Sequence, residues 1–72
     1  MIEWVRSEPG VYEDVNGRFT IIKAYDRVYG NHWQLHDTIE PNYYKGLYDE
    51  TSLRDCKLRA EAILNWEKKN GT

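Results

Sequence analysis

The dipeptide Asn16-Gly17 constrains this chain most, because it lies between two segments that have the composition of β-strands. Residues 11–15 have a period-two apolar pattern, and residues 18–25 are rich in β-branched and aromatic side chains. Both features are typical of strands. Asn-Gly favours a type I′ turn, in which both central residues have positive φ. The sequence therefore predicts an antiparallel β-hairpin over residues 11–25.

Further strands are predicted on both sides of this hairpin. Residues 32–36 alternate, so that Trp33 and Leu35 point to one face and the polar side chains between them to the other. Residues 43–48 are predicted to form a short last strand. Residues 1–10 end in a Pro-Gly turn signal, and they form either a short edge strand or a segment that packs on the domain.

Residues 52–70 are predicted to form the single helix of the chain. Ser52 is the expected N-cap, and Asp55 completes a weak form of the capping box. At about 100° per residue, five small or apolar side chains fall on one narrow arc and should cover a face of the sheet. They are Leu53, Cys56, Ala60, Ile63 and Leu64.

Residues 1–72 are therefore expected to form one α+β domain. Residues 1–10 are an N-terminal segment, residues 11–48 form an antiparallel meander of three or four strands, and residues 52–70 form a helix across the sheet. A chain of this size supports only a small core, which several Trp and Tyr side chains can supply.

The composition also indicates a compartment. Cys56 is the only cysteine, which excludes an internal disulfide and fits a reducing compartment. The chain shows neither the apolar length of a membrane span nor the pattern of a signal peptide. We expect a soluble cytoplasmic protein that does not contact a membrane.

The side chains that could perform chemistry have simpler explanations. On a strand, His32 and His36 lie roughly 13 Å apart, too far to share a metal ion. Asp37 and Glu40 lie in or beside a turn, where we expect solvated carboxylates. Cys56 falls on the core arc of the helix, as a small apolar residue would. The sequence predicts no enzyme, no metal site and no cofactor.

A second apolar line runs along the helix. Leu58, Ala62 and Trp66 recur every four residues on a face away from the core arc. Either the N-terminal segment or a loop folds over them, or they form an exposed patch for self-association or for a partner. The sequence leaves both alternatives open.

Three motifs resemble those of small uncharacterised proteins encoded by bacteriophages. They are GRFTI at residues 17–21, W-x-L-x-D at residues 33–37, and a helix that opens with SLR and continues to Lys57. Cys56 stands where such sequences often have Ala. The resemblance covers about two-thirds of the chain and implies the same fold and a phage origin. It implies no active site.

Binding to another protein is the leading functional prediction. The resemblance implies a phage or mobile-element accessory protein, which would modulate a host enzyme or defence complex. Aromatic and leucine side chains are the expected contacts, because such anchors contribute most of the energy of an interface. They are Trp4, Tyr43, Tyr44, Leu58 and Trp66, and a homodimer is a further form in which this surface could be used.

The alternative prediction is a small DNA-binding regulator of the excisionase or integrase-arm type. Cations would contact the phosphates, and Tyr side chains would stack on bases. The candidate cations are Arg18, Lys23, Arg54, Lys57 and Lys68. Against this alternative, the part of the chain before the helix carries more acidic than basic residues.

Overall fold

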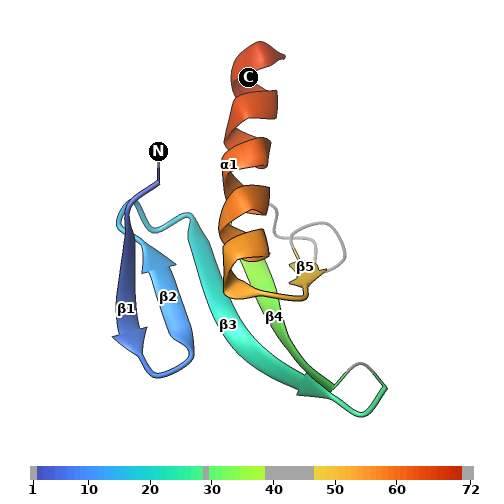
Figure 1. Cartoon of the computed structure of the whole chain (residues 1–72). Coiled ribbons are helices and arrows are strands. Elements are labelled where there is room, and N and C mark those ends of the chain that lie inside the picture. The colour runs from blue at the N-terminus through green and yellow to red at the C-terminus, as the bar shows by residue number, and fades with distance from the viewer. Residues whose placement is uncertain (1, 29, 39–46, 71–72) are drawn as a thin grey trace.

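The computed structural model describes residues 2–28, 30–38 and 47–70. These residues form a five-stranded antiparallel sheet in the order β1-β2-β3-β4-β5, followed by one helix, α1 (Figure 1). The elements are β1 (Trp4–Glu8), β2 (Val11–Asp14), β3 (Phe19–Asp26), β4 (Gly30–Asp37), β5 (Leu47–Glu50) and α1 (Leu53–Lys69).

The predicted α+β class is confirmed, with more strands than expected. The N-terminal segment forms the edge strand β1, in which Trp4 pairs with Asp14 of β2. At the other edge, β5 (Leu47–Glu50) pairs with β4 through Leu35 and Tyr48. Residues 43–46 of the predicted last strand lie outside the described residues. The sheet therefore extends beyond the predicted meander of residues 11–48 on both sides.

The hairpin over residues 11–25 is confirmed, but its turn is not of type I′. Of the two residues Asn16 and Gly17, only Gly17 has a positive φ, at 78°. The N–H of Gly17 donates to the carbonyl of Asp14, so Val15 and Asn16 are the central residues of the turn. The Asp14 carboxylate accepts the N–H of Asn16. This bond between the Asp14 side chain and the Asn16 backbone favours a hairpin loop longer than the two residues of a type I′ turn, with Gly17 in the left-handed conformation after the turn.

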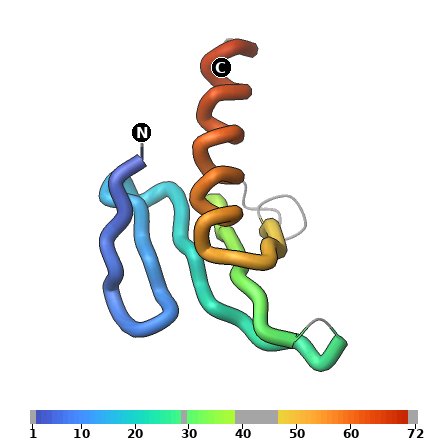
Figure 2. The backbone as a smooth tube through the Cα atoms, in the orientation of Figure 1, coloured from blue at the N-terminus to red at the C-terminus, as the bar shows by residue number. Residues whose placement is uncertain are grey.

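The helix begins where the cap predicts and crosses one face of the sheet. The Ser52 side chain accepts the N–H of Asp55, which satisfies a helix donor that has no partner inside the helix. From there α1 passes over β3, β4 and β5 (Figure 1). Its C-terminal turns extend past the ends of the strands, toward the side where the chain starts (Figure 2).

The core lies between α1 and the two central strands. Its fully buried members are Phe19 and Ile21 of β3, Leu35 of β4, and Cys56 and Ala60 of α1. The two small helix residues let the helix backbone approach the sheet closely. Leu53, Ile63 and Leu64 pack around this cluster, so the predicted core arc of the helix is confirmed.

We predict that Leu35→Ala lowers the free energy of unfolding by about 2–5 kcal/mol, because it opens a cavity under the helix. Val28→Ala, at a position where 82% of the side chain is exposed, is the control and should change it by less than about 0.5 kcal/mol. Urea unfolding followed by circular dichroism measures both values. Equal stabilities would show that Leu35 does not support the helix.

Candidate binding surfaces around the helix

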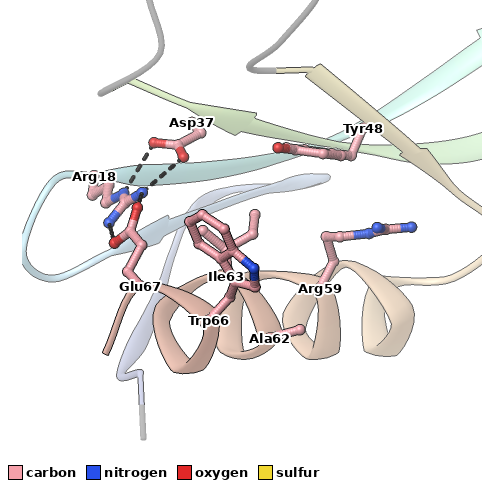
Figure 3. Close-up of a pocket in the computed structure, with 8 residues that line it drawn as sticks. All are labelled: Arg18, Asp37, Tyr48, Arg59, Ala62, Ile63, Trp66 and Glu67. Atoms are coloured by element: carbon pink, nitrogen blue, oxygen red, sulfur yellow. Dashed lines mark hydrogen bonds and ion pairs between the residues drawn. The ribbon is translucent and has the colours of Figure 1, made fainter. Parts of the chain in front are cut away.

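Arg18 joins the sheet to the end of the helix through two carboxylates. Its Nε and Nη2 atoms donate to Oδ1 and Oδ2 of Asp37, each at 3.0 Å. Its Nη1 and Nη2 atoms donate to Oε1 and Oε2 of Glu67, each at 2.7 Å. Figure 3 shows the guanidinium between the two acids. We call this cluster of Arg18, Asp37 and Glu67 the arginine bridge.

The strand register explains how the bridge forms. Phe19, the first residue of β3, pairs with Asp37, the last residue of β4, so Arg18 arrives beside the Asp37 carboxylate. The Arg18 guanidinium also lies over the Phe19 ring, 4.8 Å from its centroid. Only 2% of the Asp37 side chain is exposed. The expectation of a solvated loop carboxylate at Asp37 is therefore wrong, and Glu40 lies outside the described residues.

The bridge favours the charged forms of Arg18 and Glu67. The hydrogen bonds that Arg18 donates to Glu67 and, to a smaller extent, to Asp37 raise the pKa of Arg18 above its usual value. The hydrogen bond from Arg18 lowers the pKa of Glu67. Charged hydrogen bonds of this forked geometry are among the strongest in proteins. The two carboxylates thus serve as structural acceptors for the arginine.

A shallow groove of about 340 Å³ lies beside the bridge. One wall is the helix, with Arg59, Ala62, Ile63 and Trp66, and the other is the sheet, with Tyr48 and the bridge itself. The Trp66 indole lies beside Ile63 on the helix (Figure 3). We call this the Trp66 groove.

The second apolar line of the helix is exposed. The exposed fraction is 62% for Trp66 and 54% for Leu58, and Ala62 between them is exposed too. The N-terminal segment lies elsewhere, since the N–H of Ile2 donates to Glu61 and Ile2 packs against the core. The N-terminal segment therefore does not cover this line, and Leu58, Ala62 and Trp66 are exposed.

The other exposed side chains of the helix are mostly basic. Arg54, Arg59, Lys68 and Lys69 are all exposed. The three acidic residues of α1 are half-buried, and each accepts a hydrogen bond. Asp55 accepts from Thr51, Glu61 from the N–H of Ile2, and Glu67 from Arg18. We call Leu58, Ala62 and Trp66, together with these four cations, the basic helix surface.

The remaining predicted protein contacts do not join this surface. Trp4 is half-buried in β1 and its ring lies 6.4 Å from the ring of Phe19, at the side of the core. Tyr43 and Tyr44 lie outside the described residues. Arg59 was not among the predicted contact residues. In the structure its guanidinium lies 5.3 Å from the centroid of the Tyr48 ring, and its Nε donates to Glu50.

The predicted nucleic-acid residues are divided among three places. Arg18 belongs to the arginine bridge, where both of its edges are engaged. Arg54 and Lys68 lie on the basic helix surface. Lys23 and Lys57 lie over two aromatic rings on the sheet, Trp33 and Tyr12 respectively.

The two histidines take part in hydrogen bonds on the face of the sheet that points away from the helix. The Nδ1 atom of His32 lies 3.2 Å from the carbonyl of Gly30, and its Nε2 atom lies 3.2 Å from Oδ1 of Asp49. His36 Nε2 lies 3.4 Å from Oε1 of Gln34. Both are half-buried, so they are less solvated than expected.

Cys56 is buried in the core, as predicted, and its burial raises the pKa of the thiol to about 12. The thiol is therefore protonated at neutral pH and is a poor nucleophile. Among residues 2–28, 30–38 and 47–70, no group of three or more His, Cys, Asp and Glu side chains is placed to hold a metal ion.

No helix in the described part of the chain has the length and apolar character needed to cross a bilayer.

Comparison of the chain with protein-family models, with curated proteins and with solved structures finds no match.

We predict that Arg18→Met lowers the free energy of unfolding by about 3–5 kcal/mol, because Asp37 stays buried without its arginine. Arg18→Lys keeps the charge but lacks the planar guanidinium that forms paired hydrogen bonds with each carboxylate. Its free energy of unfolding should lie between those of the wild type and Arg18→Met. Urea unfolding at pH 7 measures the series. An Arg18→Met protein as stable as the wild type would show that the bridge contributes nothing to the fold.

The bridge also predicts a dependence of stability on pH. Because the pKa of Glu67 is lower in the folded chain than its usual 4.5, the unfolded chain binds more protons in acid. The stabilisation by Glu67 is complete above its usual pKa and disappears as the pH falls through its folded pKa. The urea midpoint should therefore fall more between about pH 6 and pH 3 for the wild type than for Glu67→Gln. Parallel curves would contradict this assignment.

Proposed function

We propose that this chain is a non-catalytic protein-binding domain whose partner docks on the basic helix surface. The observation that supports this most is the exposure of Trp66 and Leu58 one turn either side of Ala62, on a domain with few apolar residues to spare. Large apolar side chains that are exposed together mark interaction sites more often than isolated ones do. Trp is also the residue most enriched among the energetically dominant contacts of interfaces.

The charges around the second apolar line of the helix indicate the kind of partner. Arg54, Arg59, Lys68 and Lys69 surround the apolar side chains, and the acidic residues of α1 are engaged elsewhere. An apolar patch with carboxylates at its rim would complement this surface. A second copy of the chain is a poorer fit, because two basic surfaces would then face each other.

The Trp66 groove gives such a partner a place for one side chain. Its sheet wall includes Arg18 and Tyr48, and Ile63 and Trp66 make its helix wall apolar. A cavity of about 340 Å³ is near the lower end of the range for ligand clefts. It suits an anchor residue of a protein partner.

We propose further that the domain is a bacteriophage or mobile-element accessory protein that modulates a host enzyme or defence complex in the host cytoplasm. The support is the resemblance of residues 17–21, 33–37 and 52–57 to small phage-encoded proteins. A lone buried thiol is also consistent with a reducing compartment. Non-catalytic action is supported by the protonated Cys56 and by the use of Asp37 and Glu67 in the bridge.

We predict that Trp66→Ala weakens partner binding about 30-fold or more, the effect of losing one dominant anchor of roughly 2 kcal/mol. The fold should survive, because most of this side chain is exposed. A photo-reactive amino acid at position 58 would first trap the partner from host lysate, with position 28 as the control site. Calorimetric titration with the purified partner then compares Trp66→Ala with Val28→Ala.

The controls separate binding from stability. Arg59→Glu should weaken binding to an acidic partner, and Val28→Ala should leave it unchanged. Unfolding of Trp66→Ala would identify Trp66 as a core residue, and unchanged affinity would remove the basic helix surface from the interface. Sedimentation velocity of the wild type alone tests the dimer, which the charges of this surface disfavour.

A further inference from the structure

A second groove, of about 580 Å³, lies at the step where β2 stops and β3 continues. Pairing between β2 and β3 ends at Val11 and Ile22, while β3 extends to Asp26. The β3–β4 hairpin therefore runs past the β1–β2 turn and bends away from it (Figure 1). The groove is distinct from the Trp66 groove, since the two have no lining residue in common.

Aromatic rings and cations line this groove together. The Tyr12 and Trp33 rings lie 6.2 Å apart, tilted to each other, and both are half-buried. Lys23 Nζ lies 6.0 Å from the Trp33 centroid. Lys57 of the helix is not a lining residue but lies beside the groove, with its Nζ 5.4 Å from the centroid of the lining residue Tyr12. We call this site, with Arg6 and Tyr25, the aromatic–cation groove.

Arg6 and Tyr25 complete the site. Arg6 of β1 pairs in register with Tyr12, which places its side chain on the same face. Tyr25 is two residues after Lys23 and therefore points to the same face, with 72% of its side chain exposed. A Cβ at Gly10 would lie 3.3 Å from the Lys23 Cβ, so the base of the Lys23 side chain packs against the β1–β2 turn.

The lining has a charge opposite to that of the chain. The chain has 12 acidic and 10 basic residues, yet no carboxylate is among the described residues that line this groove. Two acids lie in register with lining residues: Glu8 opposite Val11, and Glu50 opposite Trp33. Glu50 accepts a hydrogen bond from Arg59. The surface is thus locally positive, which an anionic ligand requires.

We propose that the aromatic–cation groove binds single-stranded nucleic acid. Sites for single strands combine cations that follow the phosphates with rings on which successive bases stack. Arg6, Lys23 and Lys57 supply the first, and Tyr25 and Trp33 supply the second. Bases within a duplex are already stacked on their neighbours, so the rings offer little to double-stranded DNA. An acidic peptide would use the cations but would gain little from stacking.

The direct test is fluorescence anisotropy with labelled oligo(dT) and oligo(U) of about 12 nucleotides, within the usual site sizes for such domains. Both should bind at low salt, more tightly than a duplex of the same length. With three phosphate contacts, the logarithm of the association constant should fall with log salt at a slope of about −2. Comparing the two oligomers then separates a DNA ligand from an RNA ligand.

Matched variants connect binding to this groove. Tyr25→Ala should weaken it about ten-fold, and Tyr25→Phe, which keeps the ring, should bind as the wild type does. Lys23→Gln should weaken binding and reduce the salt slope, because it removes one phosphate contact. Lys69→Gln makes the same charge change at the far end of the helix, and it should change neither the affinity nor the salt slope. Trp66→Ala should also bind the oligomers normally, which separates this site from the basic helix surface.

Three results would overturn the proposal. The first is no binding of either oligomer at about 50 mM salt, where phosphate contacts are strong. The second is equal losses for Lys23→Gln and Lys69→Gln with no effect of Tyr25→Ala, which would indicate general charge attraction. The third is full competition by polyglutamate at equal charge, which would assign the groove to acidic peptides.

Discussion

The arginine bridge determines how the helix lies on the sheet, and both proposed surfaces depend on that placement. Arg18 precedes β3, Asp37 ends β4, and Glu67 belongs to the last turns of α1. Their four hydrogen bonds hold the end of the helix against the end of the sheet. The buried cluster under Cys56 and Ala60 fixes the start of the helix. A helix held at both ends cannot rotate to bury Leu58 and Trp66, so its outer side stays exposed.

The same placement separates the charges of a chain whose net charge is only −2. Acidic side chains of the helix accept hydrogen bonds from the sheet, from the N-terminal segment and from the loop before the helix. The exposed charged side chains of the helix are consequently basic, and Lys57 places a cation beside the groove, over the Tyr12 ring. Two surfaces suited to acidic ligands thus arise on an acidic protein. One carries the apolar side chains Leu58, Ala62 and Trp66 and is proposed to bind a protein, and the other carries tilted aromatic rings and is proposed to bind a single strand.

Local patterns predicted the parts of this fold that local forces determine. Alternation at residues 32–36 and the arc from Leu53 to Leu64 gave the strand and the core face, because burial imposes those periods. The burial of Asp37 could not be predicted, since it depends on Arg18 and Glu67, which are distant in sequence. The turn at Asn16 was mistaken for type I′ because the Asp14 carboxylate competes for its N–H. The aromatic–cation groove was missed because its side chains come from five elements.

The most direct test of this account is nuclear magnetic resonance of the arginine side chains. If Arg18 bonds both carboxylates, its guanidinium protons will exchange slowly with water and give separate Nη resonances at neutral pH, because rotation of the group is blocked. Those signals should disappear in Glu67→Gln, and the more exposed Arg59, bonded through Nε alone, should show rapid averaging throughout. Rapid exchange and averaging at Arg18 in the wild type would contradict the account, since the helix would then lack the bond that positions its outer surface.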